Sequence, residues 1–194
     1  MTKKEIIWRS ILHEAIENMK IELTQKELAK KYGFSLSTVF NALKAPRQSG
    51  ALKVTGRNFI IRDAEKFVYL WATDRNLEKD IIYETRIDLS PKDIEGTMPP
   101  SVVFACYSAY EKKYHETPAD YDRVYVYADD ATINEIKKRF PFKVGYANLI
   151  VLKSDPYLQI FGSVTPNVQT FADLWNVKEW YAKPFLESLK NKMF

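Results

Sequence analysis

The chain has 194 residues, of which 46% are hydrophobic and 28% charged, so it is long enough for one large or two small domains with packed cores. No apolar run approaches the roughly 20 residues that span a bilayer, and the single cysteine, Cys106, excludes an internal disulfide. Because Met1-Thr2-Lys3-Lys4 leads into an amphipathic helix rather than a signal peptide, we expect a cytoplasmic protein with no membrane partner.

Positive charge is concentrated in the first third of the chain. Residues 1–62 contain 12 basic and 5 acidic side chains, a net charge of +7, whereas residues 63–194 contain 17 basic and 20 acidic side chains, a net charge of −3. A basic segment repels itself unless a polyanion relieves the repulsion, and duplex DNA is the usual polyanion. The uneven charge therefore predicts that the amino-terminal part binds nucleic acid, while the rest packs, senses a signal or meets a partner.

The first predicted helix covers residues 2–20. Its apolar positions recur at helical spacing and make one stripe, formed by Ile7, Trp8, Ile11, Leu12, Ala15 and Met19. Such a stripe either completes the core of a three-helix head or pairs with a second copy of the chain in a dimer.

Residues 23–62 predict a helix-turn-helix followed by a hairpin. Thr24-Gln25-Lys26-Glu27 has the spacing of a capping box, so a helix is expected from this point to about Lys31. Gly33 supplies a residue that adopts positive φ after the helix end, and Ser35 caps a second helix. Two short capped helices joined by a tight turn are typical of helix-turn-helix proteins.

The second of these helices, at residues 35–45, is the predicted recognition helix. We expect its buried stripe to consist of Leu36, Val39, Phe40 and Leu43, and we expect Pro46 to end it. The opposite face carries short hydrogen-bonding side chains and one cation, which are Ser37, Thr38, Asn41 and Lys44. This set suits a helix in a DNA major groove, with Asn41 on an adenine edge and Lys44 on a guanine or a phosphate.

A basic hairpin is expected at residues 51–62, with strands at 51–54 and 58–62 on either side of a Thr55-Gly56 turn. Basic side chains in such a wing lie against phosphates or enter the minor groove. The predicted DNA-binding residues are Lys26, Lys30, Ser35, Ser37, Thr38, Asn41, Lys44, Arg47, Lys53, Arg57 and Arg62. A head of this kind also serves protein–protein contacts, which is the alternative use.

The rest of the chain alternates between helices and strands. A helix from Asp63 to about Arg75 is followed by predicted strands at 81–87, 124–128 and 148–152 and by helices beginning at Ser90 and covering 99–114, 131–140, 167–175 and 177–193. Strands separated by helices indicate a layered domain. The sequence therefore predicts an α+β fold, with an N-terminal winged helix-turn-helix domain at 1–62, a connecting helix at 63–78 and a C-terminal α/β layer domain at 79–194.

Two segments of the carboxyl-terminal half carry a family resemblance. One is Pro-Pro-Ser-Val-Val-Phe-Ala-Cys-Tyr-Ser-Ala-Tyr at 99–110, and the other is the Pro-x-x-Gln-Thr-Phe-x-Asp-Leu helix start at 166–174. With the helix-turn-helix and the Tyr-Val-Tyr-Ala strand at 125–128, they resemble the AbiEi-type antitoxins of type IV toxin–antitoxin systems and the transcriptional regulators related to them. The resemblance implies a repressor that binds its own operator through the winged helix, and a C-terminal domain that opposes a nucleotidyltransferase toxin.

The sequence offers little catalytic chemistry. His13 and His115 are its only histidines, and it has no Cys/His spacing typical of zinc sites. Gly162-Ser163 resembles the start of a nucleotidyltransferase site, but the Asp-x-Asp pair that would hold Mg²⁺ does not follow. Asp129-Asp130 suits the cap of the helix that comes next. We therefore predict no enzymatic activity, no cofactor and no metal.

Taken together, these patterns predict a sequence-specific DNA-binding transcriptional regulator that acts as a homodimer on double-stranded DNA. The alternative is a protein–protein interaction module, or an antitoxin that binds a cognate toxin protein through its C-terminal domain.

Overall fold

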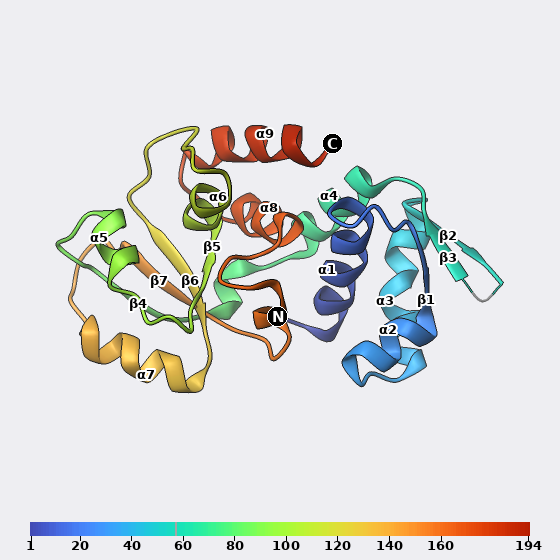
Figure 1. Ribbon diagram of the computed structural model, residues 1–194, viewed down its shortest axis with the longest axis horizontal. Coiled ribbons are helices and arrows are strands. Elements are labelled where there is room, and N and C mark those ends of the chain that lie inside the picture. The colour runs from blue at the N-terminus through green and yellow to red at the C-terminus, as the bar shows by residue number, and fades with distance from the viewer. Residues whose placement is uncertain (57) are drawn as a thin grey trace.

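The computed structural model describes residues 1–56 and 58–194, which form a mixed α/β fold as expected (Figure 1). The amino-terminal part combines helices with an antiparallel sheet. Its elements among the described residues are α1 (Lys3–Ile16), β1 (Glu22–Thr24), α2 (Gln25–Tyr32), α3 (Leu36–Gln48), β2 (Leu52–Thr55) and β3 (Asn58–Ile61). Figure 1 shows α2, α3 and the β2–β3 hairpin at one end of the molecule and a second sheet towards the other end.

The β2–β3 hairpin is extended by a strand that the sequence did not predict. β3 lies in the middle of this sheet and pairs antiparallel with β2 on one side and with β1 on the other. In this register Phe59 is opposite both Val54 and Leu23, and the side chains of Phe59 and Leu23 are buried. Because β1 leads directly into α2, the pairing ties the start of the two short helices to the hairpin.

Helix α3 runs through Pro46 to Gln48, so the prediction that Pro46 ends it is wrong. A proline inside a helix lacks the N–H that would bond to the carbonyl oxygen four residues earlier, which here belongs to Ala42. The indole Nε1 of the buried Trp8 side chain donates to that oxygen at 2.6 Å. A side chain from α1 therefore replaces the missing backbone donor, and the helix continues.

The buried face of α3 is also shifted from the predicted stripe. Leu36 and Phe40 were expected in the core, but they are 57% and 48% exposed. The side chains that pack inward are Val39, Ala42, Leu43 and Pro46. Both sets have the spacing of a helix face, so periodicity alone does not separate them. The contact between Trp8 and the Ala42–Pro46 turn of α3 decides which one faces α1.

The carboxyl-terminal part is built around a mixed sheet of order β4-β7-β6-β5. β6 and β7 are parallel, and the outer strands run antiparallel to their neighbours. The elements of this part are α4 (Ala64–Asp74), the 3-10 helix η1 (Leu77–Asp80), β4 (Ile81–Thr85), α5 (Pro91–Gly96), β5 (Val103–Ala105), α6 (Cys106–Tyr114), β6 (Val124–Ala128), α7 (Asp130–Arg139), β7 (Leu149–Lys153), the 3-10 helix η2 (Leu158–Phe161), α8 (Asn167–Trp175) and α9 (Ala182–Met193). None of the helices in the described ranges is long and apolar enough to cross a membrane.

The predicted single helix at 99–114 is wrong. Its middle forms β5, which pairs antiparallel with β6, and α6 begins only at Cys106, where φ is +51°. Val103 and Phe104 favour strands, and their pairing with β6 overrides the helical spacing of the apolar residues.

Two other helix boundaries differ from the prediction. α1 ends at Ile16 rather than at residue 20, and Met19, placed in the predicted apolar stripe, is exposed with φ of +55°. α9 begins at Ala182 rather than at Val177. The predicted helix starts after Asp63, Ser90 and Asp129 are confirmed, because each of these side chains accepts a hydrogen bond from the first turn of its helix.

Helices cover both faces of the larger sheet. On one face Val124 and Val126 of β6 pack with α5 and α7, forming a small core with Ile94 and Ile136. The alternate residues of β6, among them Tyr127, point to the other face and join the main core with α6 and α8. This main core continues into α1, α2 and α3, so one hydrophobic core links the two parts of the chain.

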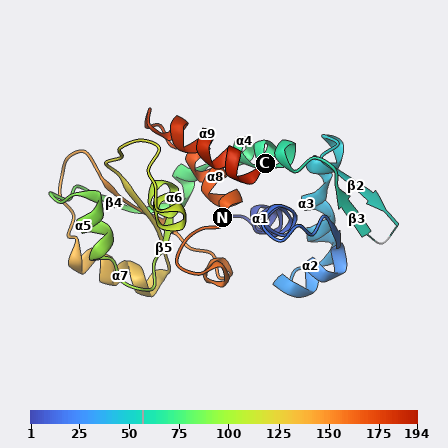
Figure 2. The same ribbon diagram turned by 45° about the horizontal axis from the view of Figure 1, so that its top comes forward.

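Helix α1 lies between α3 on one side and α4 and α8 on the other (Figure 2). From this position the fully buried Arg9 donates from Nη1 and Nη2 to the two carboxylate oxygens of Asp155, at 2.7 and 2.8 Å. Arg9 Nη1 also donates to Gln169 of α8 at 2.9 Å. The two-pronged pair with Asp155 fixes orientation as well as distance and holds α1 against the segment after β7, while the bond to Gln169 ties α1 to α8.

A second buried arginine, Arg75 at the end of α4, contacts four other elements or segments. Its guanidinium donates to Glu5 of α1 at 2.7 Å, to Asp80 of η1 at 2.9 Å and to Asp173 of α8 at 2.5 Å. It also donates to the hydroxyl of Tyr127 on β6 at 2.8 Å, and that hydroxyl donates to Asp173 at 2.8 Å. The cluster therefore joins both parts of the chain around one buried cation.

Helix α8 is capped by a residue from the other part of the chain. Pro166 precedes α8 and has no side-chain cap to offer. Glu17, just after α1, accepts a hydrogen bond from the Asn167 amide at 2.9 Å and lies close to His13 and Lys113, at 3.1 and 2.6 Å. Burial raises the pKa of Glu17, but the hydrogen bonds from His13 and Lys113 outweigh burial and hold that pKa below its ordinary value.

The hydrogen bond from Trp8 to Ala42 predicts that substitution of Trp8 lowers the stability of the fold more than substitution of an exposed tryptophan does. Trp8→Phe removes the donor and leaves a buried carbonyl unsatisfied, so we expect the free energy of unfolding to fall by about 1–3 kcal/mol. Trp180→Phe is the control, because Trp180 is 80% exposed. Urea denaturation of both full-length variants measures the difference. Equal stability of the two variants would contradict the role assigned to Trp8.

Glu17 predicts a pH-dependent part of the stability. A carboxylate whose pKa is lowered in the folded state stabilises the fold above its unfolded pKa, about 4.3, and loses that contribution as the pH falls through the folded value. Glu17→Gln should therefore reduce the free energy of unfolding by roughly 1–2 kcal/mol at pH 7 and by less at pH 3. Denaturation at several pH values tests this, with the exposed Glu187→Gln as control; a constant Glu17→Gln difference would contradict it.

Candidate nucleic-acid interface

The predicted DNA-binding residues lie on α2, on α3 and on the β2–β3 hairpin with its flanks. Arg57 lies outside the described residues. Of the others, Thr38 is half-buried, and all the rest are exposed. They share one end of the molecule, and the larger sheet with α5 and α7 lies towards the opposite end (Figure 1). The outward side of α3 therefore faces solvent.

The starts of α2 and α3 are fixed by their own caps. Thr24 and Glu27 form the predicted capping box, and Gly33 ends α2 with φ of +63°. Ser35 caps α3 by accepting from the Thr38 amide at 3.1 Å. The turn between the helices is therefore defined by local hydrogen bonds and by a glycine in the left-handed region, where other residues are strained.

Three hydroxyl groups at the start of α3 bond to one another. The Ser35 hydroxyl lies 2.9 Å from the Ser37 hydroxyl and 2.9 Å from the Thr38 hydroxyl. Ser35 and Thr38 are thereby committed to the helix start, which makes them positioning residues. The Asn41 side chain is exposed and makes no hydrogen bond to any part of the chain that the structure describes, so its amide is open to a ligand.

The described cations of the candidate interface, unlike most cations after residue 62, have no carboxylate partner. Twelve of the seventeen Lys and Arg residues after residue 62 form an ion pair. Within residues 1–56 and 58–194, six exposed cations of the candidate interface form none; they are Lys26, Lys30, Lys44, Arg47, Lys53 and Arg62. The continuation of α3 through Pro46 keeps Arg47 helical and on this surface.

The outward face of α3 contains two apolar residues that sequence reasoning placed in the core. Leu36 and Phe40 are exposed, and the ammonium group of Lys44 lies 5.6 Å from the centre of the Phe40 ring. Beside Phe40 is a small hollow of about 40 Å³ between α3, the start of α2 and β2. It is lined by Gln25, Phe40, Leu43, Lys44, Arg47 and Val54.

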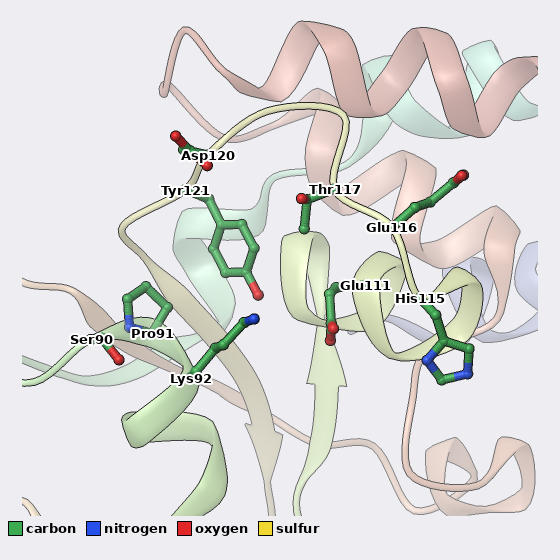
Figure 3. Close-up of a pocket in the computed structure, with 9 residues that line it drawn as sticks. All are labelled: Ser90, Pro91, Lys92, Glu111, His115, Glu116, Thr117, Asp120 and Tyr121. Atoms are coloured by element: carbon green, nitrogen blue, oxygen red, sulfur yellow. The ribbon is translucent and has the colours of Figure 1, made fainter.

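A larger hollow of about 400 Å³ lies between the start of α5 and the segment after α6 (Figure 3). Figure 3 shows Lys92 and Tyr121 pointing towards each other, with Glu111 beside them and Asp120 further out. The Tyr121 hydroxyl donates to Glu95 at 2.9 Å, and Glu95 is not one of the residues that line the hollow. The walls carry charges of both signs, so the hollow does not select a ligand of one charge.

No metal site stands out in the ranges that the structure describes: no group of three or more His, Cys, Asp or Glu side chains is placed to hold an ion. His13 contacts Glu17, and His115 ends α6 with φ of +56°. Asp129 caps α7 through the Thr132 amide at 2.8 Å.

No protein-family model, no curated protein and no solved structure matches the chain. The resemblance to AbiEi-type antitoxins therefore stays a prediction, and the case for a function depends on the surface chemistry described above.

The unpaired cations predict a specific change in salt dependence. Each phosphate neutralised on duplex DNA contributes roughly −0.9 to the slope of log affinity against log salt concentration. Lys53→Gln, which removes an exposed cation of the hairpin, should weaken binding to all duplexes and reduce the magnitude of that slope by about 0.9. Lys138→Gln, which changes an exposed lysine on α7, should leave it unchanged. Fluorescence anisotropy at salt concentrations between about 50 and 200 mM measures the affinity of both variants.

Proposed function

We propose that the chain is a sequence-specific regulator that binds double-stranded DNA through a winged helix-turn-helix at its amino-terminal end. The observation that carries the proposal is the set of six exposed cations without carboxylate partners around α3 and the hairpin. A protein keeps such a surface at a cost in self-repulsion, and a phosphate backbone relieves it.

The arrangement of elements supports the same proposal. α3 would enter the major groove with Ser37, Asn41 and Lys44 towards the base edges, while Lys53 and Arg62 on and beside the hairpin would meet the backbone. The hairpin lies beside α3 at the same end of the molecule, as a wing requires (Figure 1). We further propose that two copies act together, each on one half-site, with half-sites about one helical turn apart.

The carboxyl-terminal half supports a second candidate function, which is a contact with a protein partner. Several large apolar side chains on this half are exposed, among them Phe142 at 70% and Trp180 at 80%. Aromatic residues of this kind are enriched at protein interfaces. In an AbiEi-like antitoxin these side chains would contact the toxin, and in a regulator without a toxin they would contact another partner or a second copy.

Selection of bound duplexes from a random pool, with the full-length chain, tests the main proposal. We expect enrichment of one sequence, with two related half-sites if the protein binds as a dimer. Absence of any duplex binding at low salt would overturn the proposal and leave the protein-contact function.

Asn41 should act on specificity rather than on general affinity. Asn41→Ala should lose about 1–3 kcal/mol of binding free energy on the selected duplex, because a paired adenine contact is lost, and little on random DNA. Anisotropy titrations with both duplexes measure this. The matched control is Asn134→Ala, an exposed asparagine on α7. If Asn41→Ala weakened both complexes equally, Asn41 would not read a base.

A further inference from the structure

Leu36 and Phe40 are apolar side chains on the helix that also carries Lys44 and Arg47, two of the six exposed cations without a carboxylate partner. They lie one helical turn apart on α3, and they are 57% and 48% exposed. The inward side of α3 is complete without them, since Val39, Ala42, Leu43 and Pro46 already fill it. Their exposure is therefore not needed for packing within the chain, and it leaves apolar area open to whatever α3 binds.

The polar and charged side chains around these two residues restrict the kind of partner that the outward face of α3 can bind. Ser37, Asn41 and Lys44 share the outward face of α3 with them, and Arg47 follows one turn after Lys44. A purely apolar partner would bury these polar and charged groups at a high cost. An occupant that combines a polyanionic backbone with a few apolar groups matches both kinds of side chain.

Duplex DNA offers one such apolar group in its major groove, the 5-methyl group of thymine, which apolar side chains such as Phe recognise by contact. We infer that Leu36 and Phe40 read thymine methyl groups, an inference that rests on the proposed function and extends it to the base recognised. Residues one turn apart on a helix are separated by about 6 Å along its axis, close to two base steps of 3.4 Å. The two side chains therefore meet thymines at nearby positions of one half-site.

The hollow beside Phe40 supports this assignment independently. Its volume of about 40 Å³ is above the roughly 10–15 Å³ that a cavity needs to hold one water molecule, so it has room for a group of methyl size. Phe40, Leu43 and Val54 give it apolar walls, while Lys44 and Arg47 stand at the same hollow as cations. A thymine methyl group enters such a space while the two cations contact the neighbouring phosphates or base edges.

Replacement of thymine by deoxyuridine in the selected duplex tests the inference, because it removes only the methyl group and leaves base pairing unchanged. With the full-length wild-type chain we expect about a fourfold loss of affinity for each methyl group that is read, the effect of one buried methylene. Phe40→Ala should bind the thymine duplex more weakly and should show a smaller loss when uracil replaces thymine at the position that Phe40 reads. Leu36→Ala should do the same at a second position.

Leu89→Ala is the matched control, since Leu89 is an exposed leucine in the segment between β4 and α5, in the other part of the chain. It should keep the wild-type response to uracil. Equal binding of the thymine and uracil duplexes by the wild-type chain would overturn the inference while leaving the proposed function in place, whereas failure to select any duplex would remove the proposed function itself. The inference would also be overturned if Phe40→Ala and Leu36→Ala both lost as much affinity on the uracil duplex as the wild-type chain does. A further contrary result would be that Phe40→Ala converts a dimer to a monomer while the wild-type chain binds the thymine and uracil duplexes equally.

Discussion

The buried guanidinium of Arg75 is the interaction on which the arrangement of the two parts depends. It donates to carboxylates from α1, η1 and α8 and to a hydroxyl from β6, so elements that are distant in sequence all contact the same buried cation. Asp80 is shared with the amino group of Met1, at 2.8 Å. Removing one partner of a buried ion pair leaves an uncompensated charge, which destabilises a protein far more than the intact pair stabilises it. Each of these elements is therefore held in place by the others.

This constraint has a consequence for the proposed DNA-binding surface. α1 is fixed to α8 through Arg9, to the Arg75 cluster through Glu5, and to α3 through Trp8. The orientation of α3 relative to the larger sheet is thus set by buried contacts rather than by a linker. Any partner that shifted α8 would act on the same contacts that position α3, which gives a physical connection between the carboxyl-terminal half and the proposed recognition helix.

Local signals in the sequence predict the structure correctly where a short stretch of chain determines it. The caps at Thr24, Ser35 and Asp129 and the left-handed turn at Gly33 were all predicted, because each depends on residues within one turn. The predictions are wrong where contact with a residue distant in the sequence determines the local structure. β5 becomes a strand because β6 lies beside it, and α3 passes Pro46 because Trp8 supplies a donor from another helix.

The candidate site was predictable in part for the same reason. The charges of Lys44, Lys53 and Arg62 are visible in the sequence, and these residues are exposed as expected. Whether a cation has a carboxylate partner depends on the fold, and so does the choice between two apolar stripes that share Val39 and Leu43. Apolar residues at helical spacing are usually core residues, so the sequence predicts Leu36 and Phe40 in the core. The packing of α3 on α1 leaves them on the surface instead.

In the proposed complex with DNA, the hydrogen bond from Trp8 would also set how much of the major groove α3 covers. Had the helix stopped at residue 45, its outward edge would have ended with Lys44. Three further helical residues, Pro46 to Gln48, add about 4.5 Å of length, which is more than the 3.4 Å rise of one base pair. In such a complex, a single indole in the core would lengthen the stretch of DNA sequence within reach of one copy of the protein by about one base pair.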